Sequence, residues 1–164
     1  MREFSKITPS MWRDKRFKAL SSSDVRLLYL YCIACEHQNS AGAFRLPRLY
    51  ACSDLGWPEQ QYQVALGELL AKGLIIRDEA TEEIYCPGWF SINPAMNKSH
   101  AQSIERRISE LESDAVREAA ETEFLQSQEE REARKSRRPA NVQPINDEVS
   151  ERLLSTRLIS RGRA

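Results

Sequence analysis

The residues best suited to metal or redox chemistry are two cysteines spaced as Cys32-x-x-Cys35, with His37 close behind. Such a pair can hold zinc or exchange a disulfide. Here it lies inside the apolar run LLYLYCIACEH, where free cysteine behaves as a small buried side chain, whereas zinc pairs usually sit on turns. No second C-x-x-C or H-x-x-x-H pair follows. We therefore expect no metal and no cofactor, either here or at Cys52 and Cys86.

The sequence contains no recognisable catalytic motif. Its two histidines, His37 and His100, belong to no nucleophile or metal motif. No G-x-x-x-x-G-K-[ST] segment is present, so nothing resembles the phosphate-binding loop of an ATPase. We expect a protein that binds and does not catalyse.

Three glutamines at the start of a predicted helix are suited to reading DNA bases. Gln60, Gln61 and Gln63 open the segment 59–73. In a helix-turn-helix the third helix of the domain presents its N-terminal residues to the major groove, where glutamine can form two hydrogen bonds with adenine. The alternative is a plain solvated face, because glutamine is also a good helix former.

Basic residues suited to phosphate contacts form three groups, although exposed Lys and Arg are common on any protein surface. Arg45 and Arg48 flank the start of the expected second helix, and Lys15, Arg16 and Lys18 form a second group before the first helix. The third group is in the stretch REARKSRR and comprises Arg131, Arg134, Lys135, Arg137 and Arg138.

The predicted β-hairpin argues against DNA contact on its side. Four carboxylates, Asp78, Glu79, Glu82 and Glu83, surround its expected tip, against the single Arg77. The phosphate backbone would repel such a tip. Either the hairpin points away from DNA or the domain mainly binds protein.

Helices and short strands alternate in the segment that must position these residues. Ser21, Ser22, Ser23 and Asp24 offer N-caps before a largely buried first helix over 25–37. The segment AFRL predicts a short strand. Pro47 then starts a short second helix that ends near Leu55. The third helix places Tyr62, Leu66, Leu69 and Leu70 on one face, with Gly73 after its end. Two apolar runs, LIIRD and IYCPGWF, then predict the hairpin. This order predicts an α+β fold, a winged helix, followed by a charged helix and a flexible tail.

The residues themselves resemble a known group of proteins. The segments EFSKITPSMW, LSSSDVRLLYLY, NSAGAFRLP, DLGW, VALGELLAKGLI and IYCPGWFSINP resemble the N-terminal modules of phage and prophage replication proteins. These in turn resemble the winged-helix part of DnaD-type primosome proteins and replisome organisers. The resemblance covers residues 1–97 without a single diagnostic motif, and it implies a winged helix that binds DNA or other replication proteins. Many such proteins continue into a second helical domain with aromatic anchors, but no Trp or Tyr follows Trp89 here.

Aromatic residues and charges divide the chain into three parts. All tryptophans and tyrosines lie before residue 91, so we expect a domain over 1–97 with Trp12, Trp57 and Trp89 largely buried. Basic and acidic residues number 11 and 11 in 1–97, 4 and 7 in 98–125, and 9 and 6 in 126–164. We expect a charged helical extension over 98–125 and a basic, disordered tail over 126–164.

The extension and the tail offer contacts to partners. Ile104, Ile108, Leu111 and Ala115 follow one another at four- and three-residue steps, which predicts packing on the domain or a weak homodimer. The last segment, DEVSERLLSTRLI, could form a short helix that docks on a replication protein such as a helicase or its loader. With no run of 18 apolar residues and no signal-like N-terminus, we expect a cytoplasmic protein without a membrane partner.

Three functions remain open on the sequence. The leading hypothesis is a binder of double-stranded DNA in phage-type replication. The second is a protein-interaction or oligomerisation module of the replisome. The third is a winged-helix transcription regulator, because one fold serves all of these roles.

The basic tail generates the first prediction. If the chain binds DNA, deletion of residues 126–164 should weaken binding to every duplex, because the five cations of REARKSRR would touch only phosphates. The slope of log affinity against log salt concentration should fall by about 0.9 for each phosphate that the shortened chain no longer neutralises. Titrations at several salt concentrations measure both effects. A parent chain with no salt-dependent binding would instead favour the protein-interaction function.

Overall fold

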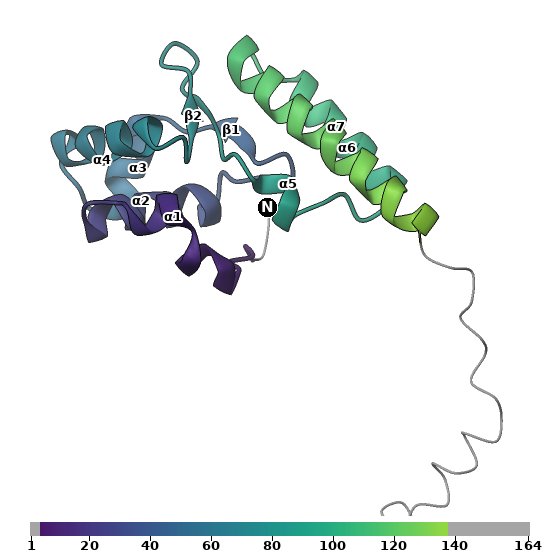
Figure 1. The fold of residues 1–164 in the computed structure, drawn as a ribbon. Coiled ribbons are helices and arrows are strands. Elements are labelled where there is room, and N and C mark those ends of the chain that lie inside the picture. The colour runs from purple at the N-terminus through teal and green to yellow at the C-terminus, as the bar shows by residue number, and fades with distance from the viewer. Residues whose placement is uncertain (1–3, 138–164) are drawn as a thin grey trace, which may run out of the picture. The chain divides into compact units, whose positions relative to one another are not determined.

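The computed structural model describes residues 4–137 (Figure 1). Along this part of the chain the elements are η1 (Pro9–Arg13), α1 (Lys15–Lys18), α2 (Ser23–Ala34), β1 (Ala43–Arg45), α3 (Arg48–Leu55), α4 (Glu59–Ala71), β2 (Ile76–Arg77), β3 (Glu83–Tyr85), α5 (Trp89–Ile92), α6 (Lys98–Ser109) and α7 (Asp114–Arg137). The fold is α+β and mostly helical, as expected. Among the described helices, none has the length and apolar character needed to cross a membrane.

The three short strands form one antiparallel sheet in the order β1-β3-β2. Phe44 of β1 lies opposite Ile84 of β3, and Ile76 of β2 lies opposite Tyr85. The expected hairpin is therefore present, and the strand predicted from AFRL pairs with its second strand. The loop of the hairpin contains no glycine, and Glu82 takes a left-handed conformation there, with φ of 58°.

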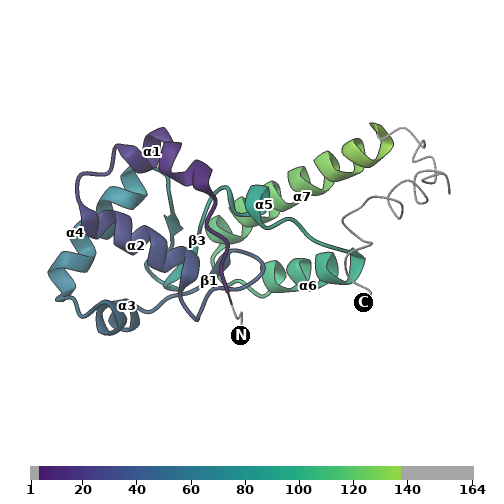
Figure 2. The same cartoon turned by 90° about the horizontal axis from the view of Figure 1, so that it is seen from below.

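The sheet separates two hydrophobic cores, because successive side chains of a strand point to opposite faces. Phe44 and Ile84 pack with α1 to α4 in the first core, whereas Ala43 and Tyr85 pack with α5 to α7 in the second. Figure 2 shows the strands between these two groups of helices.

Local signals account for the helices of the first core. The Ser22 hydroxyl accepts the Val25 N–H at the start of α2. Gly56 and Gly73 take left-handed conformations after α3 and α4, as glycine does most easily. The predicted apolar face of α4 is buried except for Leu70, which is exposed.

The second core changes the expected domain organisation. The single helix expected over 98–125 is a pair of helices, α6 and α7, which run in opposite directions and diverge from the turn that joins them (Figure 2). Ile104, Ile108 and Leu111 pack in the same cluster as Trp89, while Ala115 is exposed and Val116 is buried in its place. The compact unit extends to Arg131, so the boundary expected at residue 97 falls inside it.

The tryptophans differ in burial. Trp89 is buried, as expected, and its indole N–H donates to the Ser40 carbonyl. Trp57 is partly buried against the first core. The expectation for Trp12 is wrong, because 56% of it is exposed and its ring only touches the edge of Phe17. Trp12 lies on the short helix η1, which contributes no buried residue.

Two carboxylates attach α7 to the sheet side of the molecule. Glu83 of β3, only 7% exposed, accepts the backbone N–H groups of Glu112 (3.1 Å) and Ser113 (2.7 Å), just before α7. Glu123 of α7 accepts the Tyr85 hydroxyl at 2.6 Å and two backbone N–H groups at the start of α5. Burial, together with the bond to Glu123, raises the pKa of Tyr85.

These carboxylates generate the second prediction. We expect Glu83→Ala to lower the free energy of unfolding by about 2–4 kcal/mol, because two N–H groups would be left without an acceptor in a buried place. Glu123→Ala should also lower the free energy of unfolding. The control is Glu105→Ala, at an exposed position of α6, which should change this free energy by less than about 0.5 kcal/mol. Urea unfolding followed by circular dichroism gives the three values. Equal midpoints for Glu83→Ala and Glu105→Ala would contradict this account.

Candidate nucleic-acid interface

The turn between α3 and α4 presents the N-terminal end of α4 to solvent. The Trp57 N–H donates to the Cys52 carbonyl at 2.9 Å, which closes the end of α3. Pro58 then starts α4 without a side-chain cap. Arg48 at the start of α3 pairs with Glu59 at the start of α4 at 2.8 Å. The two helices are thus joined at the end where the sequence predicts base contacts.

The three glutamines of α4 differ in their surroundings. Gln61 is directed toward α2, and its amide donates to Asp24 at 2.8 Å. Gln63 is exposed and makes a long contact of 3.4 Å with Glu59. The side chain of Gln60 is exposed and makes no hydrogen bond to another described residue. Of the three proposed base readers, Gln60 and Gln63 therefore remain accessible, whereas Gln61 is engaged within the protein.

A groove lies beside the glutamines, between the start of α2 and α4. It has a volume of about 350 Å³ and is lined by Ser21, Ser22, Asp24, Val25, Pro58, Gln60, Gln61, Val64 and Ala65. Asp24 is the one charged residue of this lining, so the groove itself does not attract phosphate.

The two arginines near α3 are paired with acids of the same domain. Arg45 contacts Glu82 at 3.2 Å, and the backbone N–H of Arg48 also donates to Glu82 at 3.3 Å. With the Arg48 pair to Glu59, each guanidinium faces a carboxylate. Their positive charge is thus partly compensated at the place where the sequence predicts a phosphate contact.

The hairpin tip is less acidic toward solvent than the sequence suggests. Asp78 accepts the Ser113 hydroxyl at 2.8 Å, and that bond keeps the pKa of the Asp78 carboxyl below its usual value. Glu82 pairs with the Arg45 side chain and accepts the Arg48 backbone N–H. Glu83 of β3 is buried beside the start of α7, where it accepts the Ser113 N–H. Glu79 remains, with 84% of its side chain exposed. Three of the four carboxylates that the sequence places around the tip thus make contacts inside the protein, and Glu79 pairs with Arg77 at 3.5 Å.

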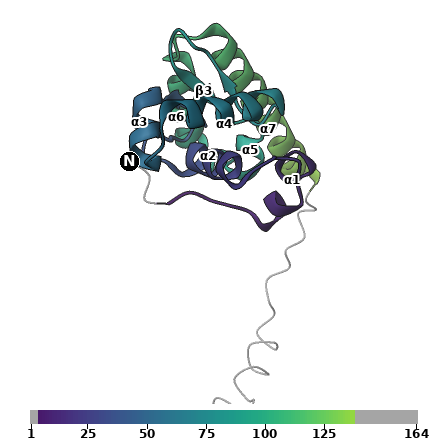
Figure 3. The same ribbon diagram turned by 90° about the vertical axis from the view of Figure 1, so that its left-hand side faces the viewer.

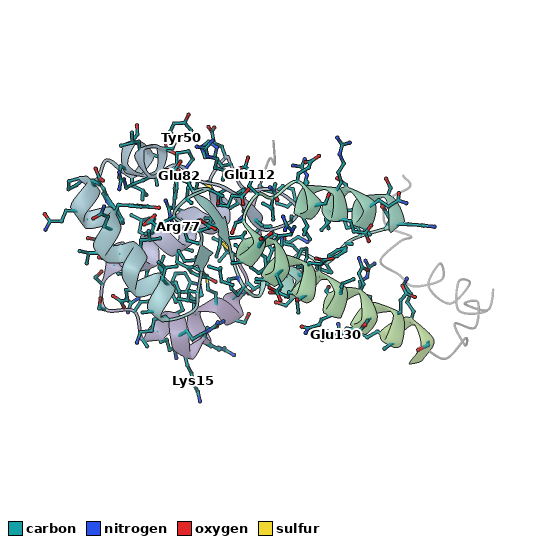
Figure 4. The ribbon with its side chains drawn as sticks, turned by 90° about the horizontal axis from the view of Figure 1, so that it is seen from above. Lys15, Tyr50, Arg77, Glu82, Glu112 and Glu130 are labelled. Atoms are coloured by element: carbon teal, nitrogen blue, oxygen red, sulfur yellow. The ribbon has the colours of Figure 1, made fainter. Side chains whose placement is uncertain are left out.

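Arg77 pairs with Glu79 of the tip at 3.5 Å, although most of its side chain lies inside the molecule between α4 and the strands (Figure 4). Its side chain is 4% exposed, and it donates to the Tyr62 hydroxyl at 2.9 Å. Burial raises the pKa of Tyr62 to about 12. This contact ties α4 to the hairpin and supports the orientation of α4.

The basic residues of α1 lie at the opposite end of α4. Arg16 donates to the Gly73 carbonyl at 3.2 Å and also pairs with Asp14. Lys15 and Lys18 are exposed and form no ion pair with any described residue. Figure 4 shows Lys15 directed away from the body of the protein.

The tail group is only partly within the described residues, since α7 continues through residue 137. Arg131 donates to the Met96 carbonyl at 3.1 Å, and Lys135 pairs with Glu132. Arg134 also has an interaction, while the side chain of Arg137, all of Arg138 and the docking segment lie outside the described part. Deletion of 126–164 would cut α7, so truncation after residue 137 isolates the remaining tail better.

The cysteines lie in and near the first core. Cys32 and Cys86 are buried, and burial raises the pKa of Cys86 to about 12 and that of Cys32 well above its usual value. Thiols held in this neutral form are poor metal ligands and nucleophiles. Among residues 4–137 no three His, Cys, Asp or Glu side chains come together in a way that could hold a metal ion.

Sequence reasoning missed the apolar character of the exposed faces of α3 and α4. Val64 is 70% exposed, and Leu49, Tyr50 and Leu70 are also exposed. The His37 ring stacks on Tyr50 at 5.4 Å. A helical-wheel comparison of these residues with the buried positions 62, 66 and 69 would have placed Val64 on the solvent side.

Comparisons of the chain with protein-family models, with curated proteins and with solved structures find no match.

Proposed function

We propose that residues 4–97 form a winged helix that binds double-stranded DNA through α4. Support comes from the order α2-β1-α3-α4-β2-β3 together with the antiparallel sheet order β1-β3-β2. In this interpretation α3 and α4 are the helix-turn-helix and the β2-β3 hairpin is the wing.

The observation that carries the proposal is the accessible N-terminal half of α4. Gln60 and Gln63 project from it, while the buried residues Tyr62, Ala65 and Leu66 hold the opposite face against the core. An exposed helix of 13 residues fits the major groove, which is about 12 Å wide. The amides of Gln60 and Gln63 can each pair with an adenine there.

A second function is favoured by a different observation. The segment Glu59–Ala71 contains no Lys or Arg, and its exposed face includes Val64 and Leu70. Such a face also suits a protein partner, including a second copy of the chain. An oligomerisation module of the replisome is therefore the alternative, and a transcription regulator is the third.

The biological setting follows from the resemblance of residues 1–97 to phage and prophage replication modules. We assign the chain to phage-type DNA replication, as a replisome organiser or initiator-like protein without enzymatic activity. A helicase or its loader is the proposed partner of the C-terminal segment. A cytoplasmic location fits this role.

The third prediction concerns the glutamines of α4. We expect Gln60→Ala/Gln63→Ala to weaken binding to a preferred duplex, selected from a random pool by the parent chain, by about 1–3 kcal/mol for each bidentate contact made. Binding to random duplexes should change little, because phosphate contacts carry it. Fluorescence anisotropy with labelled duplexes measures both affinities.

The matched control is Gln102→Ala/Gln126→Ala, which removes two exposed glutamines from α6 and α7. It should bind both duplexes as the parent does. If the α4 variant also keeps the parent's preference, α4 does not read bases. If the parent binds no duplex but forms dimers in analytical ultracentrifugation, the oligomerisation function replaces DNA binding.

A further inference from the structure

A cluster of positive charge lies where α1 meets the C-terminal end of α4. The bond from Arg16 to the Gly73 carbonyl joins the two elements. Lys15 and Lys18 lie on either side of Arg16 in sequence, and Lys72 directly precedes Gly73. We call the exposed lysines Lys15, Lys18 and Lys72 the lysine surface. Lys72 was not singled out by the sequence.

The charge of this region is not cancelled by its acids. Arg16 and Arg26 add to the three lysines, and the carboxylates close enough to feel their charge are Asp14, which pairs with Arg16, and Glu68. Five cations thus face two carboxylates. Both carboxylates are also engaged in other bonds: Asp14 accepts the Arg16 and Phe17 N–H groups at the start of α1, and Glu68 accepts the Ser21 N–H at 2.7 Å and the Ser21 hydroxyl.

The lysines themselves are free to meet an external anion. Arg16 and Arg26 donate to backbone carbonyls within the domain, namely those of Gly73 and Leu20. Lys15, Lys18 and Lys72 are exposed and form no ion pair with any described residue. Glu68 lies near Lys72, but its carboxylate is bonded to Ser21, and these bonds, with a smaller effect of Lys72, hold the pKa of Glu68 below its usual value. This distinguishes the lysine surface from Arg45 and Arg48, which face Glu82 and Glu59 at the other end of α4.

The two ends of α4 therefore differ in charge. Figure 3 shows α3 at one end of α4 and α1 at the other. Gln60 and Lys72 are twelve residues apart, which in a helix corresponds to about 18 Å. The major groove is only about 12 Å wide, so a helix that places Gln60 at the base edges brings its other end to a bordering phosphate strand.

We propose that the lysine surface binds the phosphate backbone of double-stranded DNA that borders the groove occupied by α4. This inference rests on the proposed function and adds the direction in which the duplex crosses the domain. The duplex backbone passes over α1 and the end of α4, on the side away from the wing. The contacts are independent of base sequence.

The test compares two triple variants of the full 164-residue chain with equal changes in charge. The first is Lys15→Gln/Lys18→Gln/Lys72→Gln. The control is Lys98→Gln/Arg106→Gln/Arg107→Gln, which removes three exposed cations from α6. Urea midpoints equal to that of the parent establish that both variants fold. Anisotropy titrations of a random-sequence duplex at several salt concentrations give the salt slope of each chain.

We expect the first variant to reduce the slope of log affinity against log salt concentration by up to about 2.7, which is about 0.9 for each phosphate contact. The control should keep the slope of the parent. Equal slopes for both variants would overturn the inference while leaving the proposed function to the glutamine experiment. A parent that binds no duplex even at low salt would overturn the inference and the proposed function together.

Discussion

The arrangement of this protein depends on two carboxylates that each accept backbone N–H groups of a distant helix start. Glu83 of β3 binds the residues just before α7, and Glu123 of α7 binds the start of α5 and the Tyr85 hydroxyl. A carboxylate removed from water is costly unless its oxygens find donors, and free N–H groups at a helix start are suitable donors. Each contact therefore satisfies both partners. Together they hold the α6-α7 pair against the sheet and complete the second core.

This attachment also decides the electrostatics of the hairpin. Asp78 and Glu83 are occupied by the segment before α7, and Glu82 by Arg45 and Arg48. The carboxylates that seem to form an acidic tip are thus mostly structural. The arginines that seem to form a phosphate site, Arg45 and Arg48, are each paired with a carboxylate of the same domain, although both side chains stay partly exposed. What remains without such pairing is the glutamine face of α4, which carries no cation, and the lysine surface at its C-terminal end. Recognition by such a surface would separate base contacts at one end of α4 from phosphate contacts at the other.

The absence of cations from α4 has consequences for how the protein could bind DNA. Phosphate contacts supply most non-specific affinity for DNA, and α4 itself has no cation with which to make them. Affinity must then come from residues beside the helix. The exposed Val64 and Leu70 meanwhile keep protein contacts open on the same face. DNA binding and self-association would compete for α4, so one would exclude the other at a given copy of the chain.

The sequence by itself determined the helices of the first core, the paired strands and the α+β class. These depend on apolar spacing, N-caps such as Ser22 and stop signals such as Gly73, all of which act within a few residues. Only the tertiary structure decided that 98–125 is broken into two helices, that Trp12 is exposed, that Arg48 pairs with Glu59 and that Glu83 is buried. The break illustrates the reason, since the N–H groups of Glu112 and Ser113 bind Glu83, about thirty residues earlier, in place of the preceding helical turn. A contact between residues so far apart produces no periodic pattern in the sequence. It forms only because the sheet and the two cores bring these parts of the chain together.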